Sequence, residues 1–399
     1  MTCSEHLSRV LAVTQPVRDI LEQRVDEARV PTWCERRGWT SFLLALSDVQ
    51  LRACEAHGLA ESLLHLESPP SDLLELGRAV TRVTALPRVR GATALGGEAL
   101  RNVGLRKRAQ LSGLLSAVAA MAEAAERIVD VGAGSGHFTR LSADLFERDA
   151  VGLELNPARV EAARRRSDGG RARFLAVDAR DELHLSERDL AIGLHACGEL
   201  GDRLVRAAAQ ARCDLALVSC CLQKISTPTR APLGSGLELR REHLGLTNLT
   251  AQPLGVEASI GVVIAARQAR YALGLLLRAR GLALEPGAEM SGINRRRANA
   301  GLRLIAEQAL AQRRLPPPSV AELSHFEALA SEHYATIRRL SLPRSMLARL
   351  VEVLVSLDRA AHLERQGVEV RVASLFERAV SPRNIGIFSS RSGVRLPAA

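Results

Sequence analysis

The spacing of apolar residues changes along the chain of 399 residues. Up to about residue 95, apolar residues recur three and four positions apart, as in Leu73, Leu76 and Val80. This period is typical of helices with one buried face. From residue 127 onwards, short continuous apolar runs take over. We therefore predict a helical N-terminal region over residues 1–95 and a larger domain over residues 96–399.

Five short apolar runs in the larger domain predict five β-strands. They lie at residues 128–131, 150–153, 172–177, 190–194 and 215–218. Strands that alternate with helices favour a parallel sheet with both faces covered. Asn156 and Pro157 mark the start of one such helix, because Asn caps helices well and Pro suits the first helical position. The fold class that we predict is α/β, a doubly wound Rossmann-like sheet.

The pattern loosens after the fifth run. Helical spacing then returns in three segments, at residues 265–280, 296–313 and 345–366. Two late runs, residues 368–372 and 385–388, alternate between apolar and polar as strands do. We predict a mainly helical insertion at about residues 230–345, placed before a closing β-hairpin.

Basic residues outnumber acidic ones, with a formal net charge of +10 at pH 7 and a pI of about 10.0. This excess suits a polyanion such as nucleic acid. Aromatic residues make up only 3% of the chain, so side chains on which bases can stack are scarce. Only Lys107 and Lys224 are lysines, and such an arginine bias is also typical of a GC-rich genome. Charge alone therefore leaves nucleic-acid binding open.

The seven cysteines are an odd number without the spacing of a disulfide framework. The first residues show no basic stretch that leads into an apolar run. The longest apolar stretches, residues 111–122 and 258–266, are shorter than the roughly 20 residues that cross a bilayer. We therefore expect an intracellular, cytoplasmic protein without a membrane partner. The sequence leaves the oligomeric state open.

Three alternate glycines follow the first predicted strand. The segment Ile128–His137 reads IVDVGAGSGH and places Gly132, Gly134 and Gly136 between a strand and a helix. Glycine lets the backbone turn tightly and lets a ligand approach it closely. The spacing is G-x-G-x-G rather than the G-x-G-x-x-G of a dinucleotide site, and it lacks the Gly-Lys-Ser/Thr ending of a P-loop. A ligand without a pyrophosphate fits this turn better.

An acidic residue stands at the end of each of the first three predicted strands: Asp130, Glu154 and Asp178. Glu154 lies 20 residues beyond Gly134, where a carboxylate can accept hydrogen bonds from both ribose hydroxyls of an adenosine. Asp178 is placed to bind an adenine amino group. We predict S-adenosyl-L-methionine as the cofactor, because its methionine part can lie against the glycine turn. Two other interpretations remain: a turn that only packs a helix onto a strand, and a nicotinamide cofactor.

The ends of the fourth and fifth predicted strands carry a second set of candidate residues. GLHACGE and SCCLQK give His195, Cys220, Cys221 and Lys224 as candidate catalytic residues, with Cys197 nearby. In a parallel sheet these ends face the same edge as the adenosine site, on the side of the methyl group and its acceptor. His195 is also a candidate cofactor contact. The competing interpretations are a satisfied loop histidine and small buried hydrophobic residues, since free cysteine is often buried.

A metal site is a further interpretation of these residues. Structural zinc sites usually show pairs of cysteines two to four residues apart. Here His195 and Cys197 form an H-x-C pair, and Cys220 and Cys221 are adjacent. We therefore expect no metal. A nucleophilic cysteine would need a base within hydrogen-bond reach, and spacing does not reveal one.

Two basic runs stand near these motifs in the sequence. Arg106–Lys107–Arg108 precedes the first predicted strand, and Arg295–Arg296–Arg297 lies in the insertion. We consider two roles for each run: a lining of the mouth of the site, or a solvated group of charges at the end of a helix.

Together these motifs resemble the class I S-adenosylmethionine-dependent methyltransferases. DVGAGSGH, GLHACGEL and SCCLQK are similar, more narrowly, to the methyltransferase domain of glutathione S-transferase C-terminal domain-containing protein and of the methyltransferase-like protein twenty-five group. The cysteine pair of the fifth strand also resembles that of enzymes that methylate a 2'-hydroxyl in the tRNA acceptor stem. The resemblance covers roughly residues 100–225 and 365–390.

The resemblance implies a Rossmann-like methyltransferase sheet, S-adenosyl-L-methionine as cofactor, and cofactor contacts from Asp130, Gly132, Gly134, Glu154 and Asp178. The function that it implies is S-adenosylmethionine-dependent methylation. RNA, either tRNA or rRNA, is the acceptor that we rank first because of the charge and the relatives. Two alternatives stay open: a non-catalytic protein that binds S-adenosylmethionine or RNA, and an NAD-dependent oxidoreductase.

Overall fold

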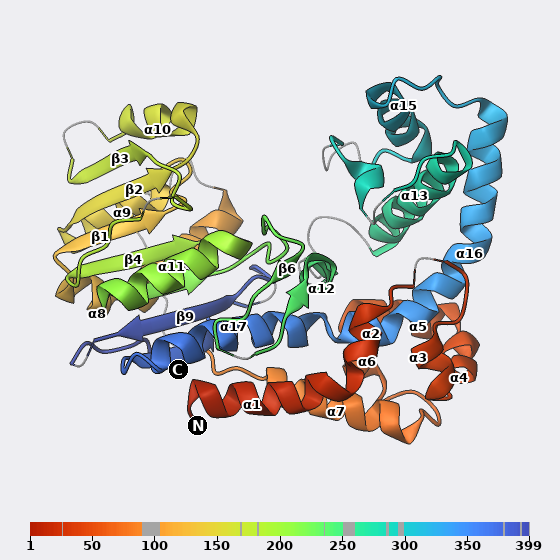
Figure 1. Cartoon of the computed structure of the whole chain (residues 1–399), viewed down its shortest axis with the longest axis horizontal. Coiled ribbons are helices and arrows are strands. Elements are labelled where there is room, and N and C mark those ends of the chain that lie inside the picture. The colour runs from red at the N-terminus through yellow and green to blue at the C-terminus, as the bar shows by residue number, and fades with distance from the viewer. Residues whose placement is uncertain are drawn as a thin grey trace. The chain divides into compact units, whose positions relative to one another are not determined.

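The computed structural model describes residues 1–25, 27–89, 104–167, 170–181, 183–234, 236–249, 260–284, 287–293, 299–377, 380–391 and 393–398. The chain divides into two compact units, each built from segments that are far apart in the sequence (Figure 1). Unit 1 comprises Met1–Pro16, Thr81–Pro253 and Ala348–Ala399, and unit 2 comprises Val17–Val80 and Leu254–Leu347. The basic run Arg295–Arg296–Arg297 lies outside the described residues.

Unit 1 is built on a seven-stranded sheet with the order β3-β2-β1-β4-β5-β9-β8. Strands β1 to β5 are parallel, and β9 runs antiparallel to both β5 and β8. The strands are β1 (Arg127–Val131), β2 (Asp149–Glu154), β3 (Ala172–Ala176), β4 (Asp189–Leu194), β5 (Asp214–Val218), β8 (Glu369–Ser374) and β9 (Ile385–Ser390). The predicted Rossmann-like sheet and its closing hairpin are therefore confirmed.

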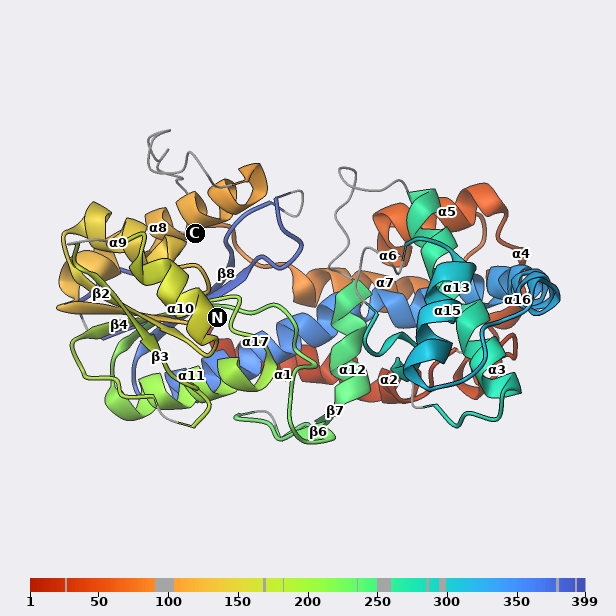
Figure 2. The same cartoon turned by 90° about the horizontal axis from the view of Figure 1, so that it is seen from above.

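Helices cover both faces of this sheet. Figure 2 shows α8 (Leu105–Ala124) and α9 (His137–Phe146) on one face, and α11 (Gly198–Ala211) and α17 (Ala348–Glu364) on the other. The strands in the middle of the sheet are buried on both sides, which explains why their sequences are continuous apolar runs. A short pair, β6 (Thr229–Arg230) and β7 (Leu239–Arg240), and α12 (Arg241–Leu246) complete the unit.

The order of the strands places the candidate residues at one edge. The chain runs from β1 outward through β2 to β3, and then returns to add β4 and β5 on the other side of β1. Open α/β sheets bind ligands at the carboxyl ends of strands around such a reversal. The glycine turn follows β1, and α10 (Pro157–Arg164) follows β2. As predicted, the Asn156 side chain caps α10 by accepting a hydrogen bond from the N–H of Ala158 at 2.9 Å.

The first helix, α1 (Cys3–Thr14), belongs to unit 1, whereas the helices that follow it up to Val80 belong to unit 2. The backbone N–H groups of Cys3 and Ser4 donate to the carboxylate of Glu364 at 2.9 Å, at the end of α17. The expected boundary near residue 95 therefore differs from the compact units, which divide near residues 16 and 80. Long-range pairing decides this division, and local periodicity does not encode it.

Unit 2 is helical. Its helices are α2 (Arg18–Glu22), α3 (Thr32–Arg36), α4 (Thr40–Ala45), α5 (Asp48–His57), α6 (Leu59–Ser62), most of α7 (Ser71–Thr84), α13 (Ile260–Ala279), α15 (Leu302–Gln312) and α16 (Val320–Met346). Leu276, Ile305 and Ala330 belong to one buried cluster that joins α13, α15 and α16. The helix predicted from residue 345 begins instead at Ala348, after α16 has ended. No helix among the described residues is long and apolar enough to span a membrane.

Candidate cofactor and acceptor site

The glycine turn after β1 leaves room for a ligand at two of its three glycines. Gly132 and Gly134 have φ angles of +79° and +59°, in the left-handed region that favours glycine. A Cβ atom at Gly132 would meet no heavy atom closer than 3.9 Å. A Cβ atom at Gly136 would lie 2.4 Å from the ring of Phe174. The missing side chain at Gly136 thus lets a helix pack against the sheet, whereas Gly132 and Gly134 line open space.

Glu154, the last residue of β2, points at the glycine turn. Its Oε2 accepts a hydrogen bond from the N–H of Gly134 at 2.9 Å, and its Oε1 accepts one from the N–H of Asn156 at 3.0 Å. Each carboxylate oxygen has a second lone pair, so both retain capacity to accept a hydroxyl proton. The two backbone donors hold the carboxylate in one position. This geometry fits the predicted grip on a ribose.

Asp130 lies beneath the turn rather than beside it. The carboxylate is buried and accepts a hydrogen bond from the hydroxyl of Thr139, in α9, at 2.6 Å. Burial raises the pKa of Asp130 to about 6, although the bonds from Thr139 and the charge of Lys107 act in the other direction. Asp130 therefore ties the turn to α9, and its charge can act on a ligand above the turn.

Asp178 follows β3 at the same edge, because the N–H of Val177 still donates to the carbonyl of Glu154 at 3.1 Å. Its carboxylate accepts from the backbone N–H and the guanidinium of Arg180, at 2.6–3.0 Å. These hydrogen bonds lower the pKa of Asp178 to about 2. An ionised, half-buried acceptor at this place suits an adenine amino group. Arg180 is a neighbour that the glycine motif and the strand pattern do not predict.

The first turns of α8 contribute to the site from the other side. Gln110 is buried, and its Oε1 lies 3.4 Å from Nε2 of His195. Burial, together with Arg106 and Lys107, lowers the pKa of His195. The charges of Arg106 and Lys107 therefore act on His195 although both residues are exposed, so both interpretations of the run stay open.

His195 is held in a strained backbone conformation after β4. Its φ angle is +69°, and its N–H donates to the carbonyl of Val218 in β5 at 2.7 Å. If Nε2–H donates to Gln110, Nδ1 carries the lone pair. Nδ1 is buried and has no hydrogen-bond partner, and the same is true of Oε1 of Gln223. Two buried acceptors without donors at the ends of β4 and β5 favour a ligand that supplies the donors.

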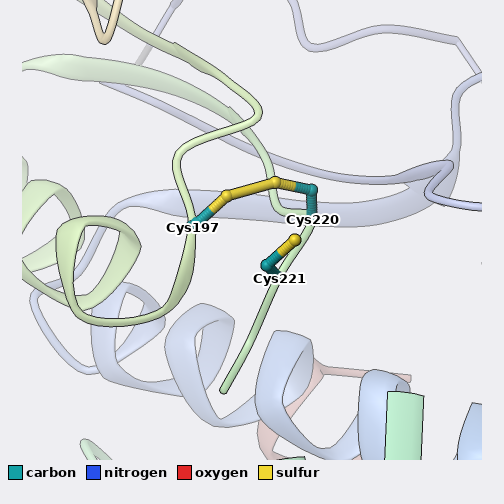
Figure 3. Close-up of side chains that lie close together, drawn as sticks. All are labelled: Cys197, Cys220 and Cys221. Atoms are coloured by element: carbon teal, nitrogen blue, oxygen red, sulfur yellow. A yellow bond between two sulfur atoms is a disulfide. The ribbon is translucent and has the colours of Figure 1, made fainter. Parts of the chain in front are cut away.

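Three cysteine sulfurs come together beside His195. Cys197 and Cys220 form a disulfide, and the Sγ of Cys221 lies beside them, with all three sulfurs within 4.8 Å of one another (Figure 3). The spacing of the cysteines did not indicate this pairing. The side chain of Lys224 is exposed, and its role as a candidate catalytic residue stays a prediction. Its backbone carbonyl accepts from the N–H of Glu199 at 2.9 Å and so joins the two loops.

A buried ion-pair network fixes the two loops that follow β4 and β5. Arg359, in α17, is fully buried, pairs with Asp202 at 2.8 Å, and donates to the carbonyl of Gly198 at 2.7 Å and to the hydroxyl of Ser219 at 2.5 Å. Burial raises the pKa of Asp202, but the guanidinium groups of Arg359 and Arg230 outweigh this effect and hold it below its ordinary value. No local sequence pattern indicates Arg359, because it lies some 140 residues from Ser219 in the chain.

Comparison with known proteins places this site in a known class. Residues 106–228 match the sequence family described as a methyltransferase domain. The glutathione S-transferase C-terminal domain-containing protein of the mouse is 29% identical over 119 residues, which make up 29% of this chain and 19% of that protein. The chain therefore spans about a fifth of the length of this curated relative.

Solved methyltransferase structures are similar to about a third of the chain. The sugar N-methyltransferase KedS8 from Streptoalloteichus is 23% identical, with a TM-score of 0.25, over 34% of this chain and 58% of that one. CalS10, an amino pentose methyltransferase from Micromonospora echinaspora, is 25% identical, with a TM-score of 0.25, over 33% and 59%. The tRNA (uracil-54, C5)-methyltransferase of Pyrococcus abyssi is 27% identical, with a TM-score of 0.23, over 28% of each chain.

Residues 106–228 thus match a methyltransferase domain, and their strands belong to a Rossmann-like sheet, the fold of the class I S-adenosylmethionine-dependent methyltransferases. S-adenosyl-L-methionine is the cofactor of this class. The residues present fit it, because the turn at Gly132 and Gly134 is open and Glu154 is aimed at that turn with lone pairs to spare. The family match favours this cofactor over the nicotinamide that the glycine motif alone left open.

Proposed function

We propose that this chain transfers a methyl group from S-adenosylmethionine to RNA, with tRNA or rRNA as the acceptor, as an RNA modification enzyme of the cytoplasm. The observation that carries the proposal is a group of positive charges around the glycine turn. Arg106 and Lys107 come from α8, and Arg140 and Arg166 come from the region of α9 and α10. Such a cationic rim suits the phosphates of a polynucleotide.

These positive charges affect the pKa of His137, the first residue of α9. Burial lowers the pKa of His137 to about 4, and Lys107, Arg140 and Arg166 act in the same direction. Arg140 donates to the backbone carbonyl of Arg166 at 3.2 Å, and the charge of Arg166 helps to lower the pKa of Arg140. Like charges gathered at the mouth of a site are costly unless an anion offsets them. A phosphate of the acceptor would supply that anion.

The cofactor would lie between the glycine turn and the end of β2. Glu154 would accept the ribose hydroxyls, the open face of Gly132 and Gly134 would receive the methionine part, and Asp178 would face the adenine amino group. When bound, S-adenosylmethionine supplies an electrophilic methyl group on a sulfonium. Because transfer from a sulfonium is already downhill, the main task of the chain is to align donor and acceptor.

The acceptor would be oriented by the ends of β4 and β5. Nδ1 of His195 and Oε1 of Gln223 are buried acceptors without donors, so each can receive a hydrogen bond from a hydroxyl or amino group of the RNA. The backbone of His195 is fixed to β5, and its ring is fixed by Gln110, which limits the positions that the substrate group can take. In this way the loop would position the attacking atom.

A single-turnover assay tests the proposal. The chain is incubated with S-adenosylmethionine labelled at the methyl group and with separate fractions of tRNA, rRNA, soluble protein and small metabolites from a cell extract. We expect label in one RNA fraction with the wild type, and less label with Glu154→Ala at the same sub-saturating concentration of the cofactor. Label in protein or metabolites alone would overturn the RNA acceptor. Cofactor binding without label in any fraction would favour the non-catalytic alternative.

A further inference from the structure

The three sulfurs of Cys197, Cys220 and Cys221 form a cluster that the methyl-transfer scheme does not use. We propose that, once the disulfide between Cys197 and Cys220 is reduced, this cluster binds one thiophilic metal ion, with Zn²⁺ as the first candidate. Among the residues that the structure describes, it is the one group of three or more His, Cys, Asp or Glu ligand atoms close enough to share an ion. The proposal goes beyond the proposed function and does not depend on it.

The distances suit such an ion. Zn²⁺ binds thiolate sulfur at about 2.3 Å in tetrahedral geometry, which places two ligand sulfurs roughly 3.8 Å apart. All three sulfurs here already lie within 4.8 Å of one another. The disulfide in the structure is the two-electron oxidised form of two of these ligands (Figure 3). Reduction by a dithiol adds two electrons and two protons, breaks the S–S bond and restores two thiol groups.

The scaffold around the sulfurs is preorganised. A Cβ atom at Gly198, which follows Cys197, would lie within 2.1 Å of the carbonyl oxygen of Lys224, so the two loops are in direct contact. Arg359 binds the carbonyl of Gly198 and the hydroxyl of Ser219, the residues next to Cys197 and Cys220. Such supporting contacts orient metal ligands and strengthen binding. Reduction therefore leaves the loops in place and frees the sulfurs.

The chemistry of the donors selects the kind of metal. The cluster consists of sulfur alone, which favours Zn²⁺ or Cu⁺ and disfavours Mg²⁺ and Ca²⁺. All three cysteines are half-buried, so an ion can reach them from solvent. Three protein ligands leave a fourth position for water or another ligand, as in zinc sites that are not purely structural.

The other cysteines offer no comparable site. Cys3, Cys34, Cys54 and Cys213 are buried, and none of them belongs to the cluster. The pair spacing in the sequence did not indicate a metal, and we expected none. The fold alters this interpretation, because it brings Cys197 beside a cysteine pair that begins 23 residues further along the chain. The resulting group of possible ligands consists of the three cysteines and does not include His195.

A metal titration tests the proposal in the absence of S-adenosylmethionine. The full chain is reduced with dithiothreitol, desalted without oxygen, and titrated with Zn²⁺ against a chromophoric chelator. We expect one equivalent of Zn²⁺ per chain, and a sulfur-to-metal charge-transfer band when Co²⁺ is used. Cys221→Ser should weaken binding by more than about tenfold, whereas Cys54→Ala, which removes a buried cysteine of unit 2, should leave it unchanged.

The proposal would be overturned if the reduced wild type did not bind Zn²⁺ stoichiometrically, or if the variant with Cys197, Cys220 and Cys221 all replaced by Ser bound it equally well. Binding that survives oxidation of Cys197 and Cys220 would also contradict it, because both sulfurs would then be unavailable. Thermal unfolding of each variant shows whether it is folded. The affinity of Cys221→Ser for S-adenosylmethionine, measured separately, keeps this test distinct from that of the proposed function.

Discussion

The ends of β1, β2 and β3 differ in chemistry from the ends of β4 and β5, although all five lie at one edge of the sheet. The ends of β1, β2 and β3, which we call the cofactor half, present carboxylates and backbone amides, with Glu154 bonded to Gly134. The ends of β4 and β5, which we call the sulfur half, present sulfur and an imidazole, and the buried Arg359 holds them. The cofactor half is built from local turns, whereas the sulfur half is fixed by a helix distant in sequence. The two halves are therefore separable by mutation.

The largest effect is expected from Arg359→Met, which removes a fully buried charge beneath the sulfur half. Asp202 would keep only Arg230 as a cationic partner, and Ser219 and the carbonyl of Gly198 would lose their donor. Breaking a buried pair costs about 3–5 kcal/mol in the free energy of unfolding. Urea denaturation measures this loss. Arg188→Met, which breaks an exposed pair with Glu126, serves as the control and should leave the midpoint unchanged. Equal midpoints for both variants would show that the network does not hold the loops.

The second effect is a pH dependence that originates in the cofactor half. Asp130 has a folded-state pKa of about 6 and an ordinary value of 3.8. The folded chain therefore binds the proton more tightly, so the stability from this group is present below about pH 4 and is lost as the pH rises towards 6. The loss amounts to about 3 kcal/mol.

Asp130→Asn removes this titration and keeps an acceptor for Thr139. The free energy of unfolding of the variant, relative to that of the wild type, should increase from pH 4 to pH 7. Urea denaturation at each pH measures both values. A difference that stays constant with pH would mean that Asp130 titrates normally. The contributions of the other titrating groups cancel in the difference between the two free energies of unfolding, because both proteins carry these groups.

The third effect concerns the cofactor half alone. Glu154→Ala should weaken the binding of S-adenosylmethionine by about 1–3 kcal/mol, because the ribose hydroxyls would lose a charged acceptor. Calorimetric titration measures the change, with NAD as a second ligand. Binding of Zn²⁺ by the reduced cysteines should be unaffected. An affinity for S-adenosylmethionine equal to that of the wild type would contradict the assignment of Glu154.

The smallest effect concerns the rim. Replacing Arg106 and Arg166 with Gln should lower the slope of log K for RNA against log salt by about 2, if each contacts one phosphate. Filter binding at several salt concentrations measures the slope. Replacing Arg188 and Arg206, which are also exposed, gives the matched control and should change it little. Equal slopes for both double variants would show that Arg106 and Arg166 do not contact the phosphates of the RNA.

The two halves also differ in how far the sequence predicts them. The glycine turn, the five strands and Glu154 follow from local patterns, because a strand–turn–helix unit encodes its own geometry. Gln110, Arg359 and the pairing of Cys197 with Cys220 depend on contacts between distant segments. The compact units likewise combine residues 17–80 with residues 254–347. Periodicity within one segment carries no signal for such contacts.

The position of the adenosine is the central claim, and a crystal structure of the chain with S-adenosylhomocysteine tests it most directly. We predict that both ribose hydroxyls lie within hydrogen-bond distance of Glu154 and that the homocysteine part lies along Gly132 and Gly134. Electron density for the ligand elsewhere, or a Glu154 carboxylate turned away from the ribose, would contradict the account.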